Sequence, residues 1–305
     1  MYGNETVSPP TAETGAITTA QQGQPTTTSG ALRFIDKAAM ARGLAAVKLH
    51  KAVSLGMPIG HNQGPIAPLR TPMQHFMQRH GGDYAIGARK EIDGFGFSDD
   101  VIMLSTHGTT HVDALCHVFC CGHMFGGIPA SEVSSFGANQ LGAETIPPIA
   151  TRAIIVDAVP EGRDWLAAGE AIPAERLDAL ISAAGLRCEP GDALIVRTGS
   201  LKAYRSGEPQ VRSWPGLGAD CVEWVKDKKI SILGADNMAV EVVPSQVKGV
   251  ATPLHTGLIF AEGVLFVELL DLEAVAGRTF EAMLTINPLR IVGGTASPVA
   301  PMLLY

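Results

Sequence analysis

Short apolar runs alternate with amphipathic segments over the second half of the chain. Arg152–Val159 and Ala193–Arg197 are rich in β-branched and other apolar residues, as buried strands are. Between them, Pro173–Gly185 carries apolar residues at helical spacing, with Pro near its start and Gly at its end. The pattern predicts a strand, a helix and a second strand in succession.

The alternation continues toward the C-terminus. We expect a helix over Gly218–Lys228 and strands over Ile230–Gly234, Val264–Leu270, Phe280–Ile286 and Ala300–Leu304. No Gly-x-Gly-x-x-Gly motif opens a helix, and no phosphate-binding loop is present. Many strands with few clear helices predict an α/β protein with a mixed β-sheet or barrel flanked by helices, and not a doubly wound nucleotide-binding fold.

The first third of the chain has a weaker pattern. Helical spacing of apolar residues predicts a helix over Ala31–His50, although Gly43 interrupts it, and a second short helix over Met73–His80. Ser54–Pro72 is rich in Gly and Pro and is expected to be a loop. Val101–Ser105 is expected to be a strand that leads into a cluster of histidines.

Composition divides the chain into two parts. Residues 1–30 are rich in Thr, Gln, Pro, Ser and Gly and show no apolar period, so they are expected to form a tail or an arm. Residues 31–305 are expected to form one domain. With 46% hydrophobic and 17% charged residues overall, the chain can bury a large core.

Charge and cysteine content narrow the classes of partner and compartment. A net charge of −7, a pI near 5.7 and the absence of a run of Lys or Arg argue against nucleic acid or an anionic membrane and leave a small molecule as the expected partner. No apolar run is long enough to span a membrane, and no secretory signal pattern is present. Five cysteines, an odd number, favour reduced thiols and a cytoplasmic location.

The candidate chemistry is concentrated between Ser105 and Phe125. His107, His111, Asp113 and His117 fall within eleven residues of a chain that has nine histidines. In an extended segment His111 and Asp113 point to the same side, and His107 and His117 are each four residues from this pair. Nitrogen and oxygen donors that converge in this way are typical of a divalent metal site.

The alternative is a set of buried histidines that bond to backbone carbonyls. Burying four such polar groups without a metal would cost roughly several kcal/mol unless each one found a partner. The grouping therefore favours the metal site.

These residues also carry a resemblance to a known family. The pattern His-x-x-x-His-x-Asp-x-x-x-His, with Thr110 just before the second His and Ala-Leu-Cys between Asp113 and His117, resembles the signature of the metal-dependent cyclase family. That family includes bacterial kynurenine formamidases and isatin hydrolases. The usual signature has Gly at Thr109 and Pro at Leu115, which, together with the chain length, is similar to a longer-chain branch of the family.

A second candidate group lies far downstream, at His255 and Glu268. Glu268 is a carboxylate in an otherwise apolar strand, where it needs a metal or a cationic partner, so a salt bridge is the alternative. The family has a similar order of His, Leu-Leu, Gly-Ile and Glu-Leu, which His255, Leu258-Ile259, Gly263-Val264 and Glu268-Leu269 match. The resemblance implies that His255 and Glu268 complete the metal site.

The resemblance, which covers about Pro72 to Pro288, has further implications. It implies a swivelling β/β/α fold with a β-barrel core, and a homodimer or higher homo-oligomer. It also implies hydrolysis of amide, lactam or formamide C–N bonds, and in some members of lactones.

The donor set itself points to hydrolysis. A divalent ion with open positions lowers the pKa of its bound water from about 15.7 to about 7. His117 and Glu268 are the candidate general base and acid. Nitrogen and oxygen donors suit Zn²⁺ or Mn²⁺, and a bridging Asp113 with His117, His255 and Glu268 would allow one ion or two. A lactone hydrolase and a non-catalytic metal-stabilised binding protein are the alternatives.

Five other groups of residues are weaker candidates. Asp236 follows a predicted strand, where it would contact the substrate or the metal ligands, or cap a loop. Arg197 would hold a carboxylate or form a structural ion pair. Cys116 is expected to pack in the core, with a nucleophile as the alternative. A zinc site at Cys120, Cys121 and His123 with His117 lacks the paired spacing of such sites and uses a histidine that the first motif needs. His61 and Asn62 would contact a ligand or lie on a polar surface loop.

Overall fold

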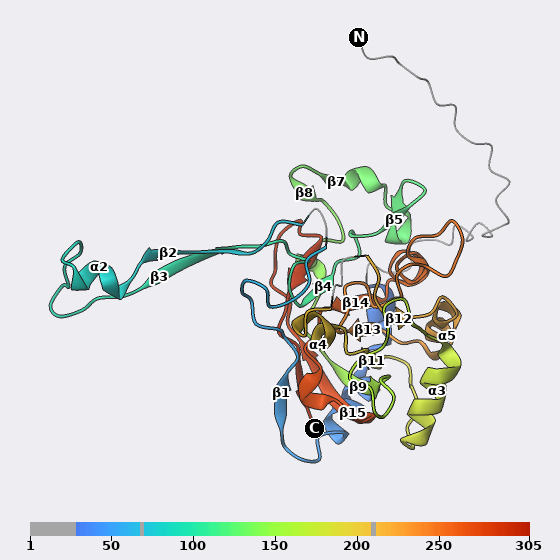
Figure 1. The fold of residues 1–305 in the computed structure, drawn as a ribbon. Coiled ribbons are helices and arrows are strands. Elements are labelled where there is room, and N and C mark those ends of the chain that lie inside the picture. The colour runs from blue at the N-terminus through green and yellow to red at the C-terminus, as the bar shows by residue number, and fades with distance from the viewer. Residues whose placement is uncertain (1–28, 68–69, 209–211) are drawn as a thin grey trace, which may run out of the picture.

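A curled sheet of nine strands forms the body of the molecule. The computed structural model describes residues 29–67, 70–208 and 212–305. The strand order is β1-β17-β15-β9-β11-β13-β14-β4-β16. Few helices accompany this sheet, so the mixed α/β class with a barrel-like sheet is confirmed (Figure 1).

The centre of the sheet is parallel and almost fully buried. It consists of β9 (Ile149–Asp157), β11 (Ala193–Arg197), β13 (Ile232–Ala235) and β14 (Leu265–Glu268), which pair in this order. Every residue of β11, β13 and β14 is buried. Strands that are covered on both faces are continuous apolar runs, which explains why the sequence pattern located them.

Antiparallel strands extend the sheet on both sides. On one side lie β15 (Phe280–Ile286), β17 (Met302–Leu304) and β1 (Ala52–Ser54). On the other side β4 (His111–Asp113) pairs antiparallel with both β14 and β16 (Ala296–Pro298). The short strand β4 is therefore held from two sides, and it carries two of the candidate metal ligands.

Helices cover the sheet. Three α-helices of the body, α3 (Ala174–Ala183), α4 (Ser200–Arg205) and α5 (Cys221–Lys228), lie outside its central strands (Figure 1). Helix α1 (Lys37–Ala45) packs on β9 and β15. A Cβ at Gly43 would lie 2.9 Å from the carbonyl carbon of Thr151 in β9. Gly43 thus allows close packing of α1 on the sheet.

The prediction of one helix over Ala31–His50 is wrong in its extent. The structure has a 3₁₀ turn, η1 (Gly30–Phe34), and then α1. The Asp36 side chain accepts a hydrogen bond from Ala39 N (2.9 Å) and starts the second helix. The predicted tail, 1–30, lies outside the described residues except for Ser29 and Gly30.

The prediction of a helix over Met73–His80 is also wrong. These residues form β2 (Gln74–Arg79), which pairs antiparallel with β3 (Asp99–Met103) in an arm that projects from the body (Figure 1). The strand expected over Val101–Ser105 is real but belongs to this arm, with the short helix α2 (Gly81–Ala85) at its tip. Among the described residues, no helix is long and apolar enough to cross a membrane.

Candidate metal centre

Strand β4 presents two donors to the same side. His111 and Asp113 are 0% and 1% exposed, and Val112 between them packs in the core on the opposite face. Thr109 O accepts a hydrogen bond from His111 Nδ1 (2.8 Å), so Nε2 is the ring nitrogen that can bind a metal, and it is directed at the carboxylates. His111 Nε2 lies 3.4 Å from Asp113 Oδ1.

Glu268 reaches the same point from the neighbouring strand. It ends β14 directly opposite His111, with Val267 opposite Val112. Its Oε2 lies 3.4 Å from His111 Nε2, and the residue is 2% exposed. The strand predicted over Val264–Leu270 therefore runs beside the strand that carries His111 and Asp113.

His107 and His117 approach Asp113 through turns. Gly108 N donates to Ser105 O (2.8 Å), and this turn brings His107 Nδ1 to 3.0 Å from Asp113 Oδ1. Nε2 of His107 lies 3.1 Å from Thr295 Oγ1. On the other side of β4, His117 N donates to Ala114 O (2.9 Å), which places the His117 ring 4.2 Å from that of His107.

His255 arrives from a third element. It is the first residue of a π-helix, η5 (His255–Phe260), and such helices are frequent at functional sites. Its Nε2 lies 3.4 Å from Glu268 Oε1 and 4.0 Å from Asp113 Oδ2. The structure therefore brings together all six residues selected from the sequence: His107, His111, Asp113, His117, His255 and Glu268.

The donor atoms form two sets that share Asp113. One set is His107, Asp113 and His117, the other is His111, Asp113 and Glu268, and the atoms of each set lie within 4.8 Å of one another. Several of these atoms are buried and have no hydrogen-bond partner in the described part of the chain: His107 Nδ1, His111 Nε2, both Asp113 oxygens and Glu268 Oε1. Buried polar atoms without partners are costly unless an ion binds them. The cluster thus suits a metal site.

Burial and mutual charge set the protonation of the cluster. Burial lowers the pKa of His107 and that of His117, which favours the neutral form that binds metal. Burial alone would raise the pKa of Asp113, but the histidines, His117 most of all, hold it well below 3.8. Burial would lower the pKa of His255, yet the adjacent carboxylates of Glu241 and Glu268 raise it to about 10.

Glu241 is a functional candidate that the sequence analysis missed. It is 0% exposed and accepts hydrogen bonds from Leu254 N (2.9 Å), His255 N (3.1 Å) and His255 Nδ1 (2.5 Å). Asn237 shapes the loop before it by accepting from Val240 N (2.7 Å). The sequence does mark Glu241, because it is a carboxylate between valines. This is the same kind of signal as Glu268, a carboxylate in an apolar strand.

Arg70 is a second residue that the sequence did not single out. Its Nη1 donates to His107 O (2.7 Å), and its charge contributes to the lowered pKa of His117. Arg70 is partly exposed, so its guanidinium places a positive charge beside the cluster at the solvent side. Arg70 lies in the loop before the arm and belongs to none of the motifs found in the sequence.

The weaker candidates have structural roles. Arg197 pairs with Asp157 (3.2 Å) and Glu273 (2.8 Å), which makes it a structural ion pair. Asp236 accepts from Thr198 N (2.8 Å) and Gly199 N (2.7 Å) and so holds the turn that leads into α4. Cys116 is buried in the core.

The remaining candidates lie at the surface. Cys120, Cys121 and His123 form no metal-binding group among the described residues. His123 Nδ1 instead contacts Cys121 O at 3.0 Å. His61 and Asn62 are exposed in a loop.

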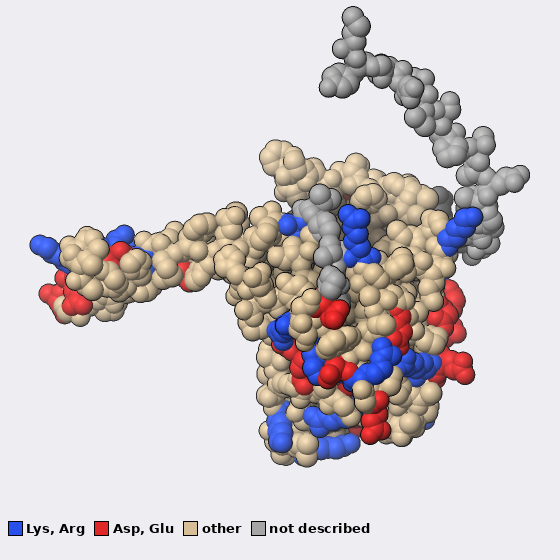
Figure 2. Space-filling view, viewed as in Figure 1, with Lys and Arg blue, Asp and Glu red and all other residues tan. Residues whose placement is uncertain are grey.

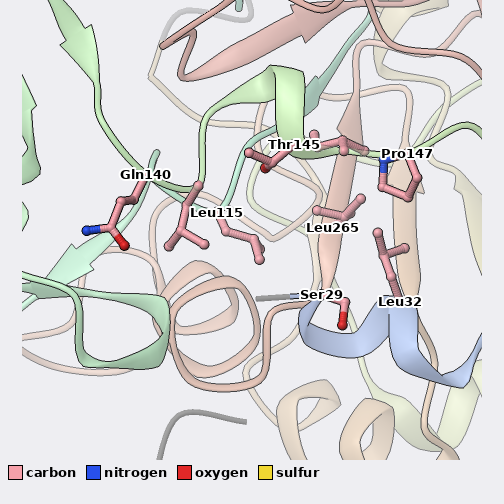
Figure 3. Close-up of a pocket in the computed structure, with 9 residues that line it drawn as sticks. Ser29, Leu32, Leu115, Gln140, Thr145, Pro147 and Leu265 are labelled. Atoms are coloured by element: carbon pink, nitrogen blue, oxygen red, sulfur yellow. The ribbon is translucent and has the colours of Figure 1, made fainter. Parts of the chain in front are cut away.

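A cavity of about 390 Å³ has none of the six clustered residues in its lining (Figure 3). Leu32, Leu115, Leu141 and Leu265 contribute to a mostly apolar lining, and Ser29, Gln140 and Thr145 are its polar residues. Among the described residues, no titratable side chain lines it. The cluster around Asp113 is therefore the candidate reaction centre.

The fold and this cluster define a metal-site protein of the cyclase type. Residues 53–242 match the model of the Cyclase family, so the chain belongs to that family. A comparison with curated protein sequences gave no match.

Solved structures agree on the fold. A crystal structure described as a novel cyclase is 29% identical, with a TM-score of 0.83, and the alignment covers 92% of this chain and 94% of the other. Isatin hydrolase A from Ralstonia solanacearum is 20% identical over 87% and 95% of the two chains, with a TM-score of 0.60. Isatin hydrolase A from Labrenzia aggregata is 18% identical over 83% and 93%, with a TM-score of 0.61.

Proposed function

We propose that the chain is a metal-dependent hydrolase that cleaves the C–N bond of a small amide, lactam or formamide. The observation that carries this proposal is the sharing of Asp113 by two donor sets in which several buried atoms have no hydrogen-bond partner among the described residues. Membership of the Cyclase family supports it. Zn²⁺ and Mn²⁺ both suit the nitrogen and oxygen donors, as one ion or two.

His107, His111, Asp113, His117, His255 and Glu268 are the residues that would hold the ion or ions. A bound divalent ion would supply a Lewis acid for the substrate carbonyl and an acidified water. Because His111 and Glu268 lie opposite each other on paired strands, the sheet holds these two donors in place without a bound metal. A fixed donor set costs little reorganisation during the reaction.

His117 is the residue placed to move a proton. It is less buried than His111, and its lowered pKa keeps it neutral and able to accept a proton near pH 7. It would take a proton from the attacking water and return it to the leaving nitrogen as the C–N bond breaks, with Glu268 as the second candidate for this role. Arg70 lies close enough to attract an anionic part of the substrate or product.

The substrate class rests on the family and on its named relatives. The two isatin hydrolases share this fold, and isatin is a cyclic amide. A cyclic or N-acyl amide is therefore the first choice of substrate. A lactone presents the same carbonyl, so ester hydrolysis on the same site remains the second choice.

Metal analysis followed by a hydrolysis screen tests the proposal. Protein purified without a histidine tag is expected to carry about one or two Zn²⁺ or Mn²⁺ per chain, by elemental analysis. Isatin, N-formyl amines and lactones are then tried as substrates. Turnover should disappear after dialysis against a chelator and return when Zn²⁺ or Mn²⁺ is added.

A matched histidine variant serves as the control. His123→Ala removes an exposed histidine outside the cluster and should change neither metal content nor rate. Stoichiometric metal without turnover of any of the three substrate classes would instead support a metal-stabilised binding protein. Protein without bound metal, and without affinity for added metal, would refute both interpretations.

A further inference from the structure

Two adjacent cysteines lie at the tip of a small hairpin that follows the metal motif. The hairpin consists of β5 (Phe119–Cys120) and β6 (His123–Met124), and Cys120 pairs with His123 across it. Cys121 and Gly122 form the turn between the strands, with φ angles of 52° and 78°. Asn-Gly, Asp-Gly and Gly-Gly are the usual pairs in a turn of this kind. Turn preference alone therefore does not account for a cysteine at this position.

The turn brings the two thiols together. Side chains of adjacent residues in a strand point to opposite faces. Because Cys121 has a left-handed backbone, its Sγ instead lies 3.5 Å from that of Cys120. Ala130 N donates to Gly122 O (2.8 Å), and His123 Nδ1 lies 3.0 Å from Cys121 O, so the turn is held from both sides. The two sulfurs are thus close before any reagent arrives.

The other three cysteines are in less reactive surroundings. Cys116 and Cys221 are 2% and 0% exposed, and Cys188 is half-buried. Burial raises the pKa of Cys116 to about 11 and those of Cys188 and Cys221 to about 12. Oxidants react with the thiolate of an accessible cysteine. Selective oxidation is therefore expected at the hairpin and not at these three positions.

Few acidic groups oppose a thiolate at this turn. Residues 114–131 contain no Asp or Glu. On the face of the body shown in Figure 2, acidic side chains gather in the lower half, whereas β5 lies in the upper part (Figure 1). A carboxylate beside a thiol would raise the pKa of that thiol. The surroundings of the pair therefore permit the thiolate that oxidation requires.

The two thiols are not equivalent. The hydrogen bond with Cys121 raises the pKa of Cys120, so Cys120 holds its proton more firmly. Cys121 is exposed, whereas Cys120 is half-buried. Cys121 is thus the thiol that meets a reagent first, and Cys120 stands beside it as the resolving thiol. Redox-sensing cysteines are often paired in this way.

We propose that Cys120 and Cys121 form a reversible oxidation site for hydroperoxides. The Cys121 thiolate attacks the terminal oxygen of the hydroperoxide, so that an S–O bond forms and the O–O bond breaks. The proton that the thiol gave up completes the alcohol that leaves. Cys120 Sγ then attacks the Cys121 sulfur, the S–S bond forms, the S–O bond breaks and water leaves. Two thiols lose two electrons in total, and one hydroperoxide is reduced to an alcohol and water.

The disulfide between adjacent residues is expected to be short-lived. Consecutive Cα atoms are about 3.8 Å apart across a trans peptide, whereas disulfides usually join Cα atoms at least about 4.4 Å apart. A ring closed between neighbours is therefore strained. Strained and exposed disulfides are reduced more easily than relaxed ones. A small thiol reductant should thus reopen this one.

The hairpin connects this chemistry to the metal cluster. β5 begins two residues after His117 and packs against η5, the helix that begins with His255. Closing the ring draws the sulfurs from 3.5 Å to about 2.05 Å, which requires a change in the backbone of the turn. We expect β5 to move against η5 and to shift these two histidines. This step rests on the metal site proposed above, and it predicts that the oxidised protein binds Zn²⁺ about fivefold or more weakly.

Thiol counting tests the oxidation site without any assumption about the metal. The full chain, purified without a tag, is treated with one equivalent of tert-butyl hydroperoxide and then denatured. Free thiols should fall from five to three per chain and return to five with dithiothreitol. Peptide mass spectrometry should find one peptide that spans both cysteines and has lost the mass of two hydrogen atoms. Phenylarsine oxide, which binds two neighbouring sulfurs with loss of water, should protect the same pair.

Single variants separate the two roles. Cys121→Ser should lower the rate of oxidation by at least about tenfold, because the exposed thiol is absent. Cys120→Ser should stop at a sulfenic acid on Cys121, which dimedone traps. Cys188→Ser is the matched control, since it removes a half-buried thiol outside the hairpin, and it should be oxidised like the wild type. Melting temperatures of the reduced proteins check that each variant is folded.

Three results would overturn the oxidation site: a disulfide that joins two chains, loss of thiols at Cys188 or the buried cysteines first, or a Cys121→Ser variant that is oxidised as fast as the wild type. Equal affinity of the oxidised and reduced proteins for Zn²⁺ would overturn the link to the cluster. Reduced protein that binds no Zn²⁺ would instead refute the proposed metal site, and the thiol count would still decide whether the pair is oxidised.

Discussion

Glu268 lies directly opposite His111 in the antiparallel pairing of β14 with β4, and its Oε2 is 3.4 Å from His111 Nε2. Two segments that are more than 150 residues apart in the chain thus meet through backbone hydrogen bonds. The register of the sheet, and not a flexible loop, sets the distance between these donors. We therefore expect the cluster to be rigid before metal binds.

The first prediction concerns the residues at the centre of both donor sets. His111→Ala and Asp113→Ala should each lower metal affinity by more than about 100-fold, because a direct ligand contributes more than the outer partners whose loss costs 10–100-fold. Turnover should be lost with the metal. Elemental analysis and circular dichroism on one preparation check that the metal is lost and the fold is kept. A variant with full metal and a normal rate would remove its residue from the site.

The second prediction separates a base from a ligand at His117. If it moves a proton, His117→Ala should keep the metal content near that of the wild type and lower kcat by about 10²–10⁴-fold. Small primary amines or imidazole added to the variant should restore part of the rate. If His117→Ala instead loses one of two ions per chain, the residue binds a second metal, as its grouping with His107 and Asp113 suggests.

The third prediction addresses Glu241, which holds His255 through its Nδ1. Glu241→Gln leaves one oxygen to accept three hydrogen bonds and puts an amide against a backbone N–H. Metal affinity should fall about 10–100-fold, as is typical when the partner of a histidine ligand is lost. Titration with Zn²⁺ and a competing chelator measures this.

The control for Glu241 is Glu262→Gln, which removes a charge near Lys226 at the surface. It should not change metal affinity. If Glu241→Gln lowers the melting temperature of the metal-free protein but binds Zn²⁺ like the wild type, then Glu241 only supports the fold.

Part of the site could be predicted from local spacing. In a strand, His111 and Asp113 must share a face. Because His107 and His117 are each only four residues away in sequence, they must lie close to that face. The buried strands β9 and β11 were also predictable, because burial on both faces requires continuous apolar runs. These features depend on interactions that are close in sequence.

Other parts depend on contacts that spacing does not encode. Met73–His80 was predicted to be a short helix from its local sequence, whereas the pairing of β2 with β3 makes it a strand that exposes Phe76 and Met77 on an arm. Glu241 reaches His255 only through a loop shaped by Asn237. Arg70 approaches His107 by its backbone carbonyl, a contact that any residue at that position would offer.

The fourth prediction uses Asp236, a buried carboxyl outside the cluster. Burial raises its pKa to about 6 from the usual 3.8. The native state then holds a proton more tightly than the unfolded state, so this group's contribution to stability decreases as pH rises from about 4 to about 6. Asp236→Asn lacks the titration. The stability gap between wild type and variant should therefore narrow over this range.

Urea unfolding at pH 4.5 and 7, with a chelator present, measures that gap for Asp236→Asn. The variant should be less stable at pH 4.5 by about 1–3 kcal/mol, because an amide replaces one of the two oxygens that accept from Thr198 and Gly199. A gap that widens with pH would mean that these donors outweigh burial and favour the charged form.

The last prediction joins the two halves of the donor set through Glu268. Glu268→Gln keeps the shape of the side chain and removes its charge. The negative charge is then lost beside both His255, which faces the unpartnered Oε1, and His111, which faces Oε2. Metal affinity or kcat should fall by well over about tenfold. Because Asp113 acts on the same ion, the effects of Glu268→Gln and Asp113→Asn should not add in the double variant.

The test compares both single variants and the double variant. Measuring metal content, melting temperature and kcat on the same preparations shows whether Glu268 acts on the metal or only on stability. If Glu268 served only as an ion pair with the histidines, Glu268→Gln would melt earlier while each folded molecule kept its metal and its rate. Its effect would then add to that of Asp113→Asn. Additive losses with normal metal content would place Glu268 outside the metal site, even though it lies opposite His111 in the sheet.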